Sequence, residues 1–336
     1  MMSEPKIMDL SDFFPAEKID SRPIYFWALN ARRSMVELYE QVAAISNVET
    51  KIITEKDCRG DFLSALKIMN GAEGAIHVFS GYMTSELVRK LMLVAGARRQ
   101  KVVVYDDAPI ENEIGFAAFL KRLSYDLFLK SKVSWAVRAA DLFITASGEK
   151  NLERLIALGW KKEKIVPFGR FPAPLTGERE SAVAEKKPNS LRVLHLGRES
   201  ANRNLSFVVK AARLAQVELV RSGGWMGESD LLRVIRSSDV VVAAGVNEPW
   251  GERINTALLE GVPVIVSGGM GSAILCKEFG CGLVFPEKNL AALASAFRHL
   301  ADDDEAYKKL KAGAETAKTA LLPQNRATFF LETIRG

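Results

Sequence analysis

Short runs of β-branched and aliphatic residues alternate with longer amphipathic stretches along this chain. Such alternation is typical of β–α–β units, in which a helix connects two parallel strands. The sequence therefore predicts an α/β fold with parallel sheets. The strands expected in the first half are Pro23–Ala28, Val48–Thr54, Gly74–Phe79, Lys101–Tyr105, Leu142–Ala146 and Lys164–Val166, and those in the second half are Leu191–Leu196, Val217–Arg221, Val240–Ala244 and Val264–Ser267.

The alternation is interrupted between Pro172 and Ser190 by a polar segment flanked by prolines. This composition is typical of a linker between domains. We therefore expect two doubly wound, Rossmann-like domains that face a central cleft, over residues 1–172 and 191–322. One charged helix is expected over Leu290–Ala317, and a C-terminal helix in residues 323–336 is expected to cross back to the first domain.

The composition narrows the class of protein. The chain has 336 residues, which fits two domains of roughly 150 residues each. No apolar run approaches the roughly 18 residues of a membrane span, and the N-terminal residues lack a signal-peptide layout, so we expect a cytoplasmic protein. The net charge of +5 gives a slight preference for anionic partners. No nucleic-acid-binding motif accompanies this charge, so a nucleic acid partner is not expected.

Two loops of the second half carry the strongest functional signals. In open parallel sheets, ligands bind where strands end and helices begin. The first loop, 197–204, begins with Gly197 and contains Arg198 and Arg203. Guanidinium groups at that position suit a diphosphate, although two solvated arginines on an ordinary loop are an equally good interpretation. The second loop follows Val240–Ala244 and reads Glu248-Pro-Trp-Gly, then a helix and a Gly-Val-Pro turn.

Together, these loops resemble the retaining glycosyltransferases of family 4, which have the GT-B fold of two Rossmann-like domains. The resemblance covers most of the second half of the chain; the first half agrees only in its α/β pattern. It implies that the second domain binds a nucleotide-diphosphate sugar and the first domain binds the acceptor. It also implies that Arg198 and Arg203 hold the diphosphate and that Glu248 contacts the donor sugar as a catalytic residue. Arg203 stands where the family usually has lysine.

The chain departs from the family pattern at the second glutamate, which is expected to bind the ribose hydroxyls. In the ungapped register this position is Thr256, and Thr256 or Asn255 would have to make that contact. The alternative register pairs Glu252 with Glu260. We reject it because Glu260 would lie about 12 Å further along the helix, at its C-terminal end, where we expect a surface residue.

Three further residues are weaker candidates. Trp225 follows a strand at a place where it could cover the nucleotide base, and packing is an equally good interpretation. Gly271 belongs to a glycine-rich loop before a helix, whose backbone amides could hold phosphate or sugar oxygens; a flexible turn is the alternative. His77 lies near a strand end and could contact the donor sugar as a catalytic residue, or could be structural.

Other polar residues are expected to have no direct part in the chemistry. His195 should lie in the core and His299 on an exposed helix. The carboxylates of Asp106 and Asp107 follow a strand and should cap the next turn, or could assist an acceptor hydroxyl. The histidines and cysteines are scattered, so neither a metal site nor any cofactor is expected.

A basic amphipathic stretch lies at residues 119–132, where lysines and an arginine alternate with leucines and phenylalanines. It is suited to peripheral contact with the inner face of a membrane. A helix packed on its own domain, with a solvated basic face, is the favoured alternative.

The resemblance therefore implies a glycosyltransferase of the hexosyltransferase type. We expect it to move a sugar from a nucleotide-diphosphate donor to a glycan or lipid-linked acceptor with retention, in surface polysaccharide assembly. Thr256 motivates an alternative of another class: a catalytically inactive GT-B-like protein that binds nucleotides or serves as a partner subunit.

Overall fold

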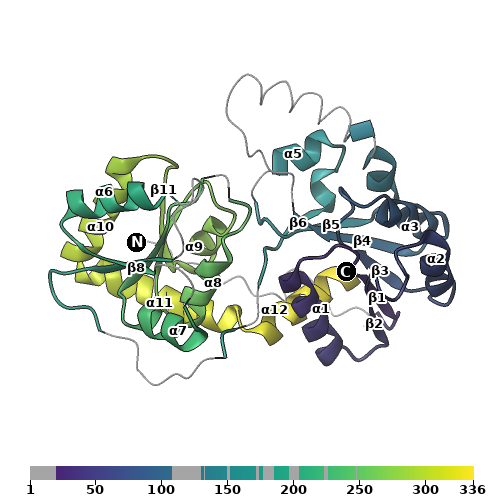
Figure 1. Ribbon diagram of the computed structural model, residues 1–336, viewed down its shortest axis with the longest axis horizontal. Helices are drawn as coiled ribbons and strands as arrows, with labels where there is room; N and C mark the ends of the chain where they lie inside the picture. Colours follow the sequence, from purple (N-terminus) through teal and green to yellow (C-terminus); the bar gives the residue numbers. More distant parts are fainter. Residues whose placement is uncertain are drawn as a thin grey trace, which may run out of the picture.

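A computed structural model describes residues 20–107, 130–131, 133–149, 152–171, 174–176, 185–196, 204–222, 226–246 and 248–336. Two α/β domains lie side by side (Figure 1). The basic stretch at 119–132 lies outside the described residues, apart from residues 130–131.

The first domain is built on a six-stranded parallel sheet with the order β2-β1-β3-β4-β5-β6. Its strands are β1 (Ile24–Trp27), β2 (Thr50–Ile53), β3 (Ile76–Phe79), β4 (Lys101–Asp106), β5 (Leu142–Thr145) and β6 (Ile165–Pro167). Its helices are α1 (Arg33–Ile45), α2 (Phe62–Asn70), α3 (Glu86–Ala97) and α5 (Leu152–Ala157), with helical residues also at 133–139. The expected strands are thus present, with bounds that differ from the expected ones by at most two residues.

The second domain has a five-stranded parallel sheet with the order β11-β10-β9-β7-β8. Its strands are β7 (Arg192–Leu196), β8 (Glu218–Ser222), β9 (Val240–Ala243), β10 (Val264–Ser267) and β11 (Gly282–Phe285). Its helices are α6 (Leu205–Ala215), α7 (Glu228–Arg236), α8 (Glu252–Leu259), α9 (Ala273–Phe279), α10 (Leu290–Asp302) and α11 (Asp304–Ala320). Strand order reverses at β1/β3 in one sheet and at β7/β9 in the other, which is where doubly wound folds bind ligands.

The central strands of each sheet, such as β1, β9 and β10, are apolar at consecutive positions and buried on both faces, as expected of strands covered by helices on two sides. In β1, Ile24 and Phe26 pack on the side of α1, whereas Tyr25 and Trp27 pack on the side of α2 and α3. Side-chain caps start α2, α3, α10 and α11; at α2, for example, Asp61 accepts a hydrogen bond from the Ser64 amide.

The expected single helix over Leu290–Ala317 is wrong in one respect: it is broken at Asp303. The backbone of Asp303 is extended, and its carboxylate caps α11 by accepting from the Ala306 amide at 2.8 Å. Strand β11 was not expected, because Gly282 begins it and the apolar run is very short.

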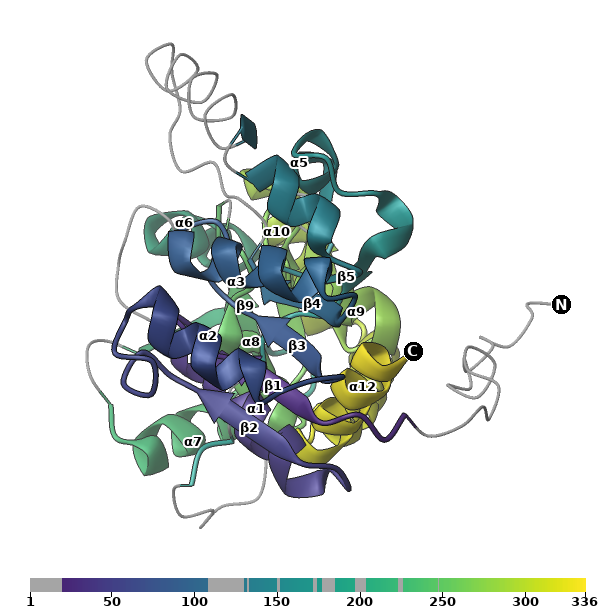
Figure 2. The ribbon, with the colours of Figure 1, turned by 90° about the vertical axis from the view of Figure 1, so that its right-hand side faces the viewer.

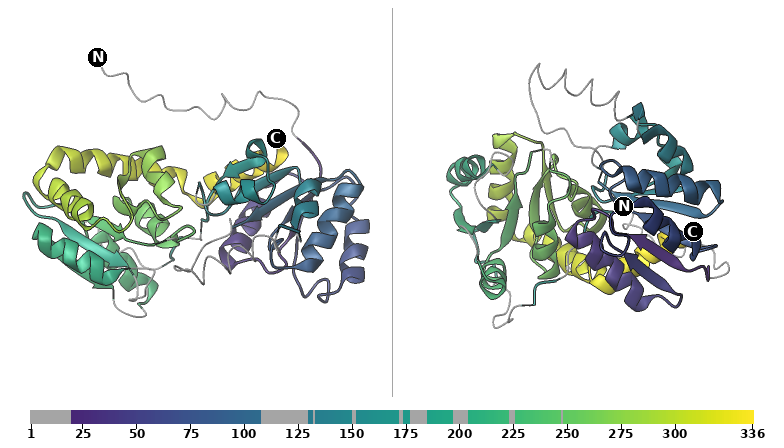
Figure 3. Two further views of the ribbon diagram at one scale, coloured as in Figure 1. Left: turned by 90° about the horizontal axis from the view of Figure 1, so that it is seen from above. Right: turned by 45° about the vertical axis from the view of Figure 1, so that its right-hand side comes forward.

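The last helix, α12 (Pro323–Arg335), leaves the second domain and packs on α1 of the first (Figures 1 and 2). Phe330 lies at its centre, fully buried, with ring centroids 5.0 Å from Tyr105 and 5.2 Å from Phe168. The view from above also places α12 between the domains (Figure 3). It therefore supplies core to the first domain from the far end of the chain.

We predict that Phe330→Ala lowers the free energy of unfolding by about 3–5 kcal/mol, because a large buried ring is lost and a cavity remains. The matched control is Thr328→Ala, an exposed position on the same helix. Denaturant unfolding, followed by circular dichroism, measures both. An equal, small effect of the two substitutions would contradict the packing role of α12.

Candidate functional site

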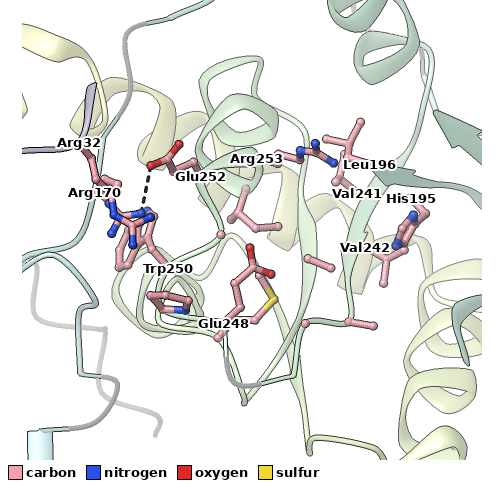
Figure 4. Close-up of a pocket in the computed structure, with 17 residues that line it drawn as sticks. Arg32, Arg170, His195, Leu196, Val241, Val242, Glu248, Trp250, Glu252 and Arg253 are labelled. Atoms are coloured by element: carbon pink, nitrogen blue, oxygen red, sulfur yellow. Dashed lines mark hydrogen bonds and ion pairs between the residues drawn. The ribbon is translucent and has the colours of Figure 1, made fainter. Parts of the chain in front are cut away.

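A cavity of about 350 Å³ lies between the two domains (Figure 4). The second domain contributes the ends of β7 and β9, residues 244–245 and 248–254, and Met270, and the first domain contributes Arg32 and Arg170. The cavity is therefore at the β7/β9 reversal, on the carboxyl edge of the sheet. It is lined by both carboxylates and guanidinium groups, which are suited to a hydroxyl-rich anion.

Glu248 lines this cavity on a firmly held segment. Its amide donates to the Gly269 carbonyl at 3.1 Å, and its carbonyl accepts from the Gly271 amide at 3.3 Å. A Cβ atom at Gly245 would lie 2.6 Å from the Glu248 carboxylate and 2.9 Å from Met270. Because glycine has no Cβ atom, the Glu248 carboxylate has room beside Gly245 at this wall of the cavity.

The glycine-rich loop at 268–272 supports Glu248 through its backbone. The amides of Gly268, Gly269, Met270, Gly271 and Ser272 all donate to protein acceptors, the last to the Trp250 carbonyl at 3.0 Å. Gly271 also has no room for a side chain, because a Cβ would lie 2.0 Å from the Pro249 carbonyl oxygen. The amide contacts expected of Gly271 towards phosphate or sugar are thus replaced by a contact with Glu248 itself.

Trp250, next to Glu248, is an interdomain residue. Its indole is fully buried and lies against Gly148, Gly169 and Phe171 of the first domain. The indole Nε1 donates to Asn255 Oδ1 at 3.2 Å, and Asn255 Nδ2 donates to the Arg170 carbonyl at 2.7 Å. Both polar ends of the Asn255 amide therefore have protein partners, so we correct the expectation that Asn255 binds a ribose hydroxyl.

A network of ions crosses the same interface. The guanidinium of Arg170, whose side chain is 5% exposed, pairs with Asp107 of its own domain and donates to Glu252 of the second domain at 3.3 Å. Ser34 also donates to Glu252, at 3.1 Å, and Arg32 pairs with Asp107 at 3.1 Å. Burial alone would lower the pKa of Arg170, but the charges of Asp107 and Glu252 outweigh it and raise the pKa.

The sequence did not reveal Arg170 or Arg32, although the strand-end rule points to both. Arg170 comes shortly after β6, and Arg32 follows β1 before α1. Arg32 is 57% exposed and lies at the cavity, on the side of the first domain (Figure 4). Both residues could have been predicted from their positions. Each is a basic residue that follows a strand, at the same edge of the sheet as Asp107.

Asp106 is a buried carboxyl at this edge. Its oxygens accept from the Gly81 amide and the Asp107 amide, both at 2.9 Å. Burial, and then the charge of Asp107, raise the pKa of Asp106 to about 7.

His77 lies inside β3 rather than at its end, and it does not line the cavity. The ring is fully buried against Tyr25, Trp27 and Phe79, and its Nδ1 accepts from the Trp27 indole at 3.0 Å. Burial lowers the pKa of His77 to about 4, so the ring is neutral near pH 7. His77 is therefore a packed core residue away from the cavity, which corrects the expectation that it contacts the donor sugar.

Two other expectations concern α8. Glu260 is not a surface residue: it is 3% exposed and pairs with Arg236 of α7 at 2.7 Å. It does lie at the C-terminal end of α8, far from the cavity. Thr256 is half-buried in the middle of α8 and is not among the cavity-lining residues, so its contact with ribose stays a prediction.

Four predicted ligand residues, Gly197, Arg198, Arg203 and Trp225, lie outside the described residues. The strands that precede these residues are described. Leu196 ends β7 and lines the cavity, and Ser222 ends β8, which pairs with β7 in the sheet. His195 is 2% exposed in β7, as expected of a core residue, and it also lines the cavity.

Within the described ranges, no group of His, Cys, Asp and Glu side chains could hold a metal ion. No helix in that part of the chain has the length and hydrophobicity needed to cross a bilayer.

We predict that Gly169→Ala destabilises the protein through Trp250, because the new Cβ would lie 2.3 Å from the indole. Gly159→Ala is the matched control: its φ of +105° is nearly that of Gly169, at +106°, but its Cβ would meet nothing within 4 Å. Thermal unfolding should show a loss of at least about 1 kcal/mol beyond the control. Equal losses of stability in the two variants would mean that Trp250 can move away from the new Cβ atom without destabilising the protein.

Asp106 makes stability depend on pH. Because its folded pKa of about 7 lies above its unfolded value, the folded state holds the proton more tightly, and stability falls as pH rises from about 4 to about 7. We predict that Asp106→Asn flattens this part of the stability–pH curve, measured by denaturant unfolding at a series of pH values. Asp302→Asn is the control. An unchanged slope in Asp106→Asn would contradict the raised pKa.

Residues 185–317 match the family model of the glycosyl transferases group 1, which spans the second domain. Among curated proteins, none matches the chain. Solved structures match nearly the whole chain at low identity. HepE of Anabaena, in complex with UDP, has a TM-score of 0.59 at 14% identity, covering 93% of this chain and 99% of its own.

Two further structures agree with this result. Sucrose-phosphate synthase from Thermosynechococcus elongatus has a TM-score of 0.60 at 14% identity, covering 94% of this chain and 98% of its own. The lipopolysaccharide outer core galactosyltransferase WaaB, in its apo form, has a TM-score of 0.60 at 9% identity, covering 93% and 99%. The chain therefore has the GT-B fold, and its second domain matches the group 1 glycosyl transferases.

Proposed function

We propose that this protein is a glycosyltransferase that moves a sugar from a nucleotide-diphosphate donor to a glycan or lipid-linked acceptor. The observation that carries the proposal is the position of Glu248. It lines an interdomain cavity at the β7/β9 reversal, in a domain that matches the group 1 glycosyl transferases. Retention of configuration and a role in surface polysaccharide assembly belong to this proposal through the resemblance to family 4.

In this proposal the two domains bind different substrates: the second domain binds the donor and the first domain binds the acceptor. Glu248 accepts hydrogen bonds from hydroxyls of the donor sugar, because a carboxylate held against Gly245 is a fixed acceptor. Arg198 and Arg203, on the loop that follows Leu196, hold the diphosphate and stabilise its charge as it leaves. The acceptor enters from the first domain, on the side of Arg32.

Nucleotide titration tests the donor site. The HepE structure contains UDP, which makes UDP the first ligand to try, followed by GDP and ADP. We expect calorimetry to detect one of them, with a loss of about tenfold or more in affinity in the Arg198→Ala/Arg203→Ala variant. If none of the three binds, the donor site is wrongly assigned and only the fold remains.

We predict that Glu248→Gln lowers kcat/KM for sugar transfer by roughly 10²–10³, while the Kd of the bare nucleotide stays within about twofold. The reason is that Glu248 contacts the sugar rather than the nucleotide in this proposal. Glu305→Gln, which removes a carboxylate that is 84% exposed on α11, is the control. A loss of nucleotide affinity in place of activity would assign Glu248 to the nucleotide instead.

A second candidate is a catalytically inactive protein that binds a nucleotide or a partner subunit. It is favoured by Thr256, which stands where family 4 has its second glutamate. An assay over a panel of nucleotide sugars separates the two. Nucleotide binding without any transfer would support this second candidate.

A further inference from the structure

A second hollow, of about 570 Å³, lies in the first domain away from the interdomain cavity. Its position follows from β4: Lys101, which lines it, begins this strand, whereas Asp107, which belongs to the interdomain network, follows the end of the strand. Lys101 and Asp107 are six positions apart, which corresponds to about 20 Å of extended chain. The two hollows therefore lie at opposite edges of the same sheet.

Three separate segments bring basic side chains to this hollow. Arg22 comes from the chain before β1, Arg99 and Lys101 from the turn after α3 and the first position of β4, and Arg138 from the helical residues before β5. We call these four residues the basic pocket. One carboxylate, Asp141, also lines it, and one of its oxygens accepts from the Val102 amide at 2.9 Å.

Among the described residues, the charges of the basic pocket are only partly balanced by protein groups. Arg22 is held by Asp20 at 2.9 Å, and the Lys101 ammonium donates to the Arg335 carbonyl at 3.1 Å. Arg138 donates through Nε to the Ser134 carbonyl at 3.3 Å, which is uncharged. Burial, and then the charge of Arg22, lower the pKa of Lys101, as expected where like charges are gathered.

Arg99 is the most informative member. No described residue accepts a hydrogen bond from its side chain or forms an ion pair with it. Its backbone is left-handed, with φ of +58°, directly after the end of α3, a position where glycine or asparagine is usual. An arginine that is unpaired within the described ranges thus occupies a backbone site that local preference would give to a smaller residue.

We propose that the basic pocket binds a phosphate-bearing ligand. Two exposed guanidinium groups, Arg99 and Arg138, offer paired donors to phosphate oxygens, and Arg22 and Lys101 add positive charge at the base. The hollow is larger than a single phosphate ion, so the phosphate belongs to a larger molecule, either a free phosphorylated compound or a lipid headgroup. This inference does not depend on the proposed glycosyl transfer, because the two hollows lie at opposite sheet edges.

The test compares two variants of the full chain that lose equal charge. Arg99→Gln/Arg138→Gln removes the two exposed members of the basic pocket. Arg213→Gln/Arg298→Gln removes two exposed arginines of the second domain, on α6 and α10. Both pairs are exposed, so both variants should fold, which circular dichroism checks.

The first arm titrates inorganic phosphate at constant ionic strength, with hydrogen exchange measured at residues 96–101. The second arm measures co-sedimentation with vesicles of phosphatidylglycerol and, as the neutral comparison, phosphatidylcholine. We expect binding in at least one arm, weakened about tenfold or more by Arg99→Gln/Arg138→Gln and unchanged by the control pair.

Comparison of the two measurements shows whether the phosphate belongs to a free compound or to a lipid headgroup. Phosphate binding with slowed exchange at residues 96–101 indicates a free phosphorylated ligand, whereas binding to phosphatidylglycerol vesicles alone indicates a lipid headgroup. Absence of binding in both arms overturns the proposal. An equal effect of the two variant pairs also overturns it, because general charge attraction would then explain the binding.

Discussion

The insertion of Trp250 between the two domains is the contact on which the site depends. The indole fits against Gly148 and Gly169, neither of which has room for a Cβ atom, and it is tied through Asn255 to the Arg170 carbonyl. Glu248 lies two residues before this anchor, and the loop at 268–272 holds both residues through backbone hydrogen bonds. The position of the catalytic candidate in the cavity is therefore set by packing between domains as well as by its own strand end.

The ion network adds charge to the same interface. Arg170 is buried between carboxylates of both domains, and a buried ion pair stabilises only where its geometry and hydrogen bonds are good. The network also orients the Glu252 side chain. Ser34 and Arg170 of the first domain both donate hydrogen bonds to Glu252, at the edge of the cavity. Trp250 packing and these ion pairs both join the two domains beside the cavity.

Much of the fold was predictable because it depends on local patterns. Apolar runs predicted the strands, and the proline-flanked segment predicted a domain boundary, whose position stays a prediction. The break at Asp303 was missed because both helices around it are charged and amphipathic, so that the cap is the single signal. Strand β11 was missed because it is short and begins at glycine.

The site was less predictable, because its contacts join residues that are distant in sequence. Glu248 and the loop after β7 follow from motifs. Asn255, by contrast, looked available for a ribose until the Arg170 carbonyl, 85 positions away, was seen to accept from it. Glu260 looked exposed until the neighbouring Arg236 was placed beside it. These partners are fixed by tertiary packing, which no local pattern contains.

The return of α12 to the first domain has a consequence for synthesis. Phe330 packs on Phe26, Tyr39 and Tyr105, so this core joins residues that are 225 to 304 positions apart in the order of translation. The ribosome makes the whole second domain before it makes α12. Until then, the first domain exposes the apolar surface that α12 will cover, and it is most vulnerable to aggregation during that interval.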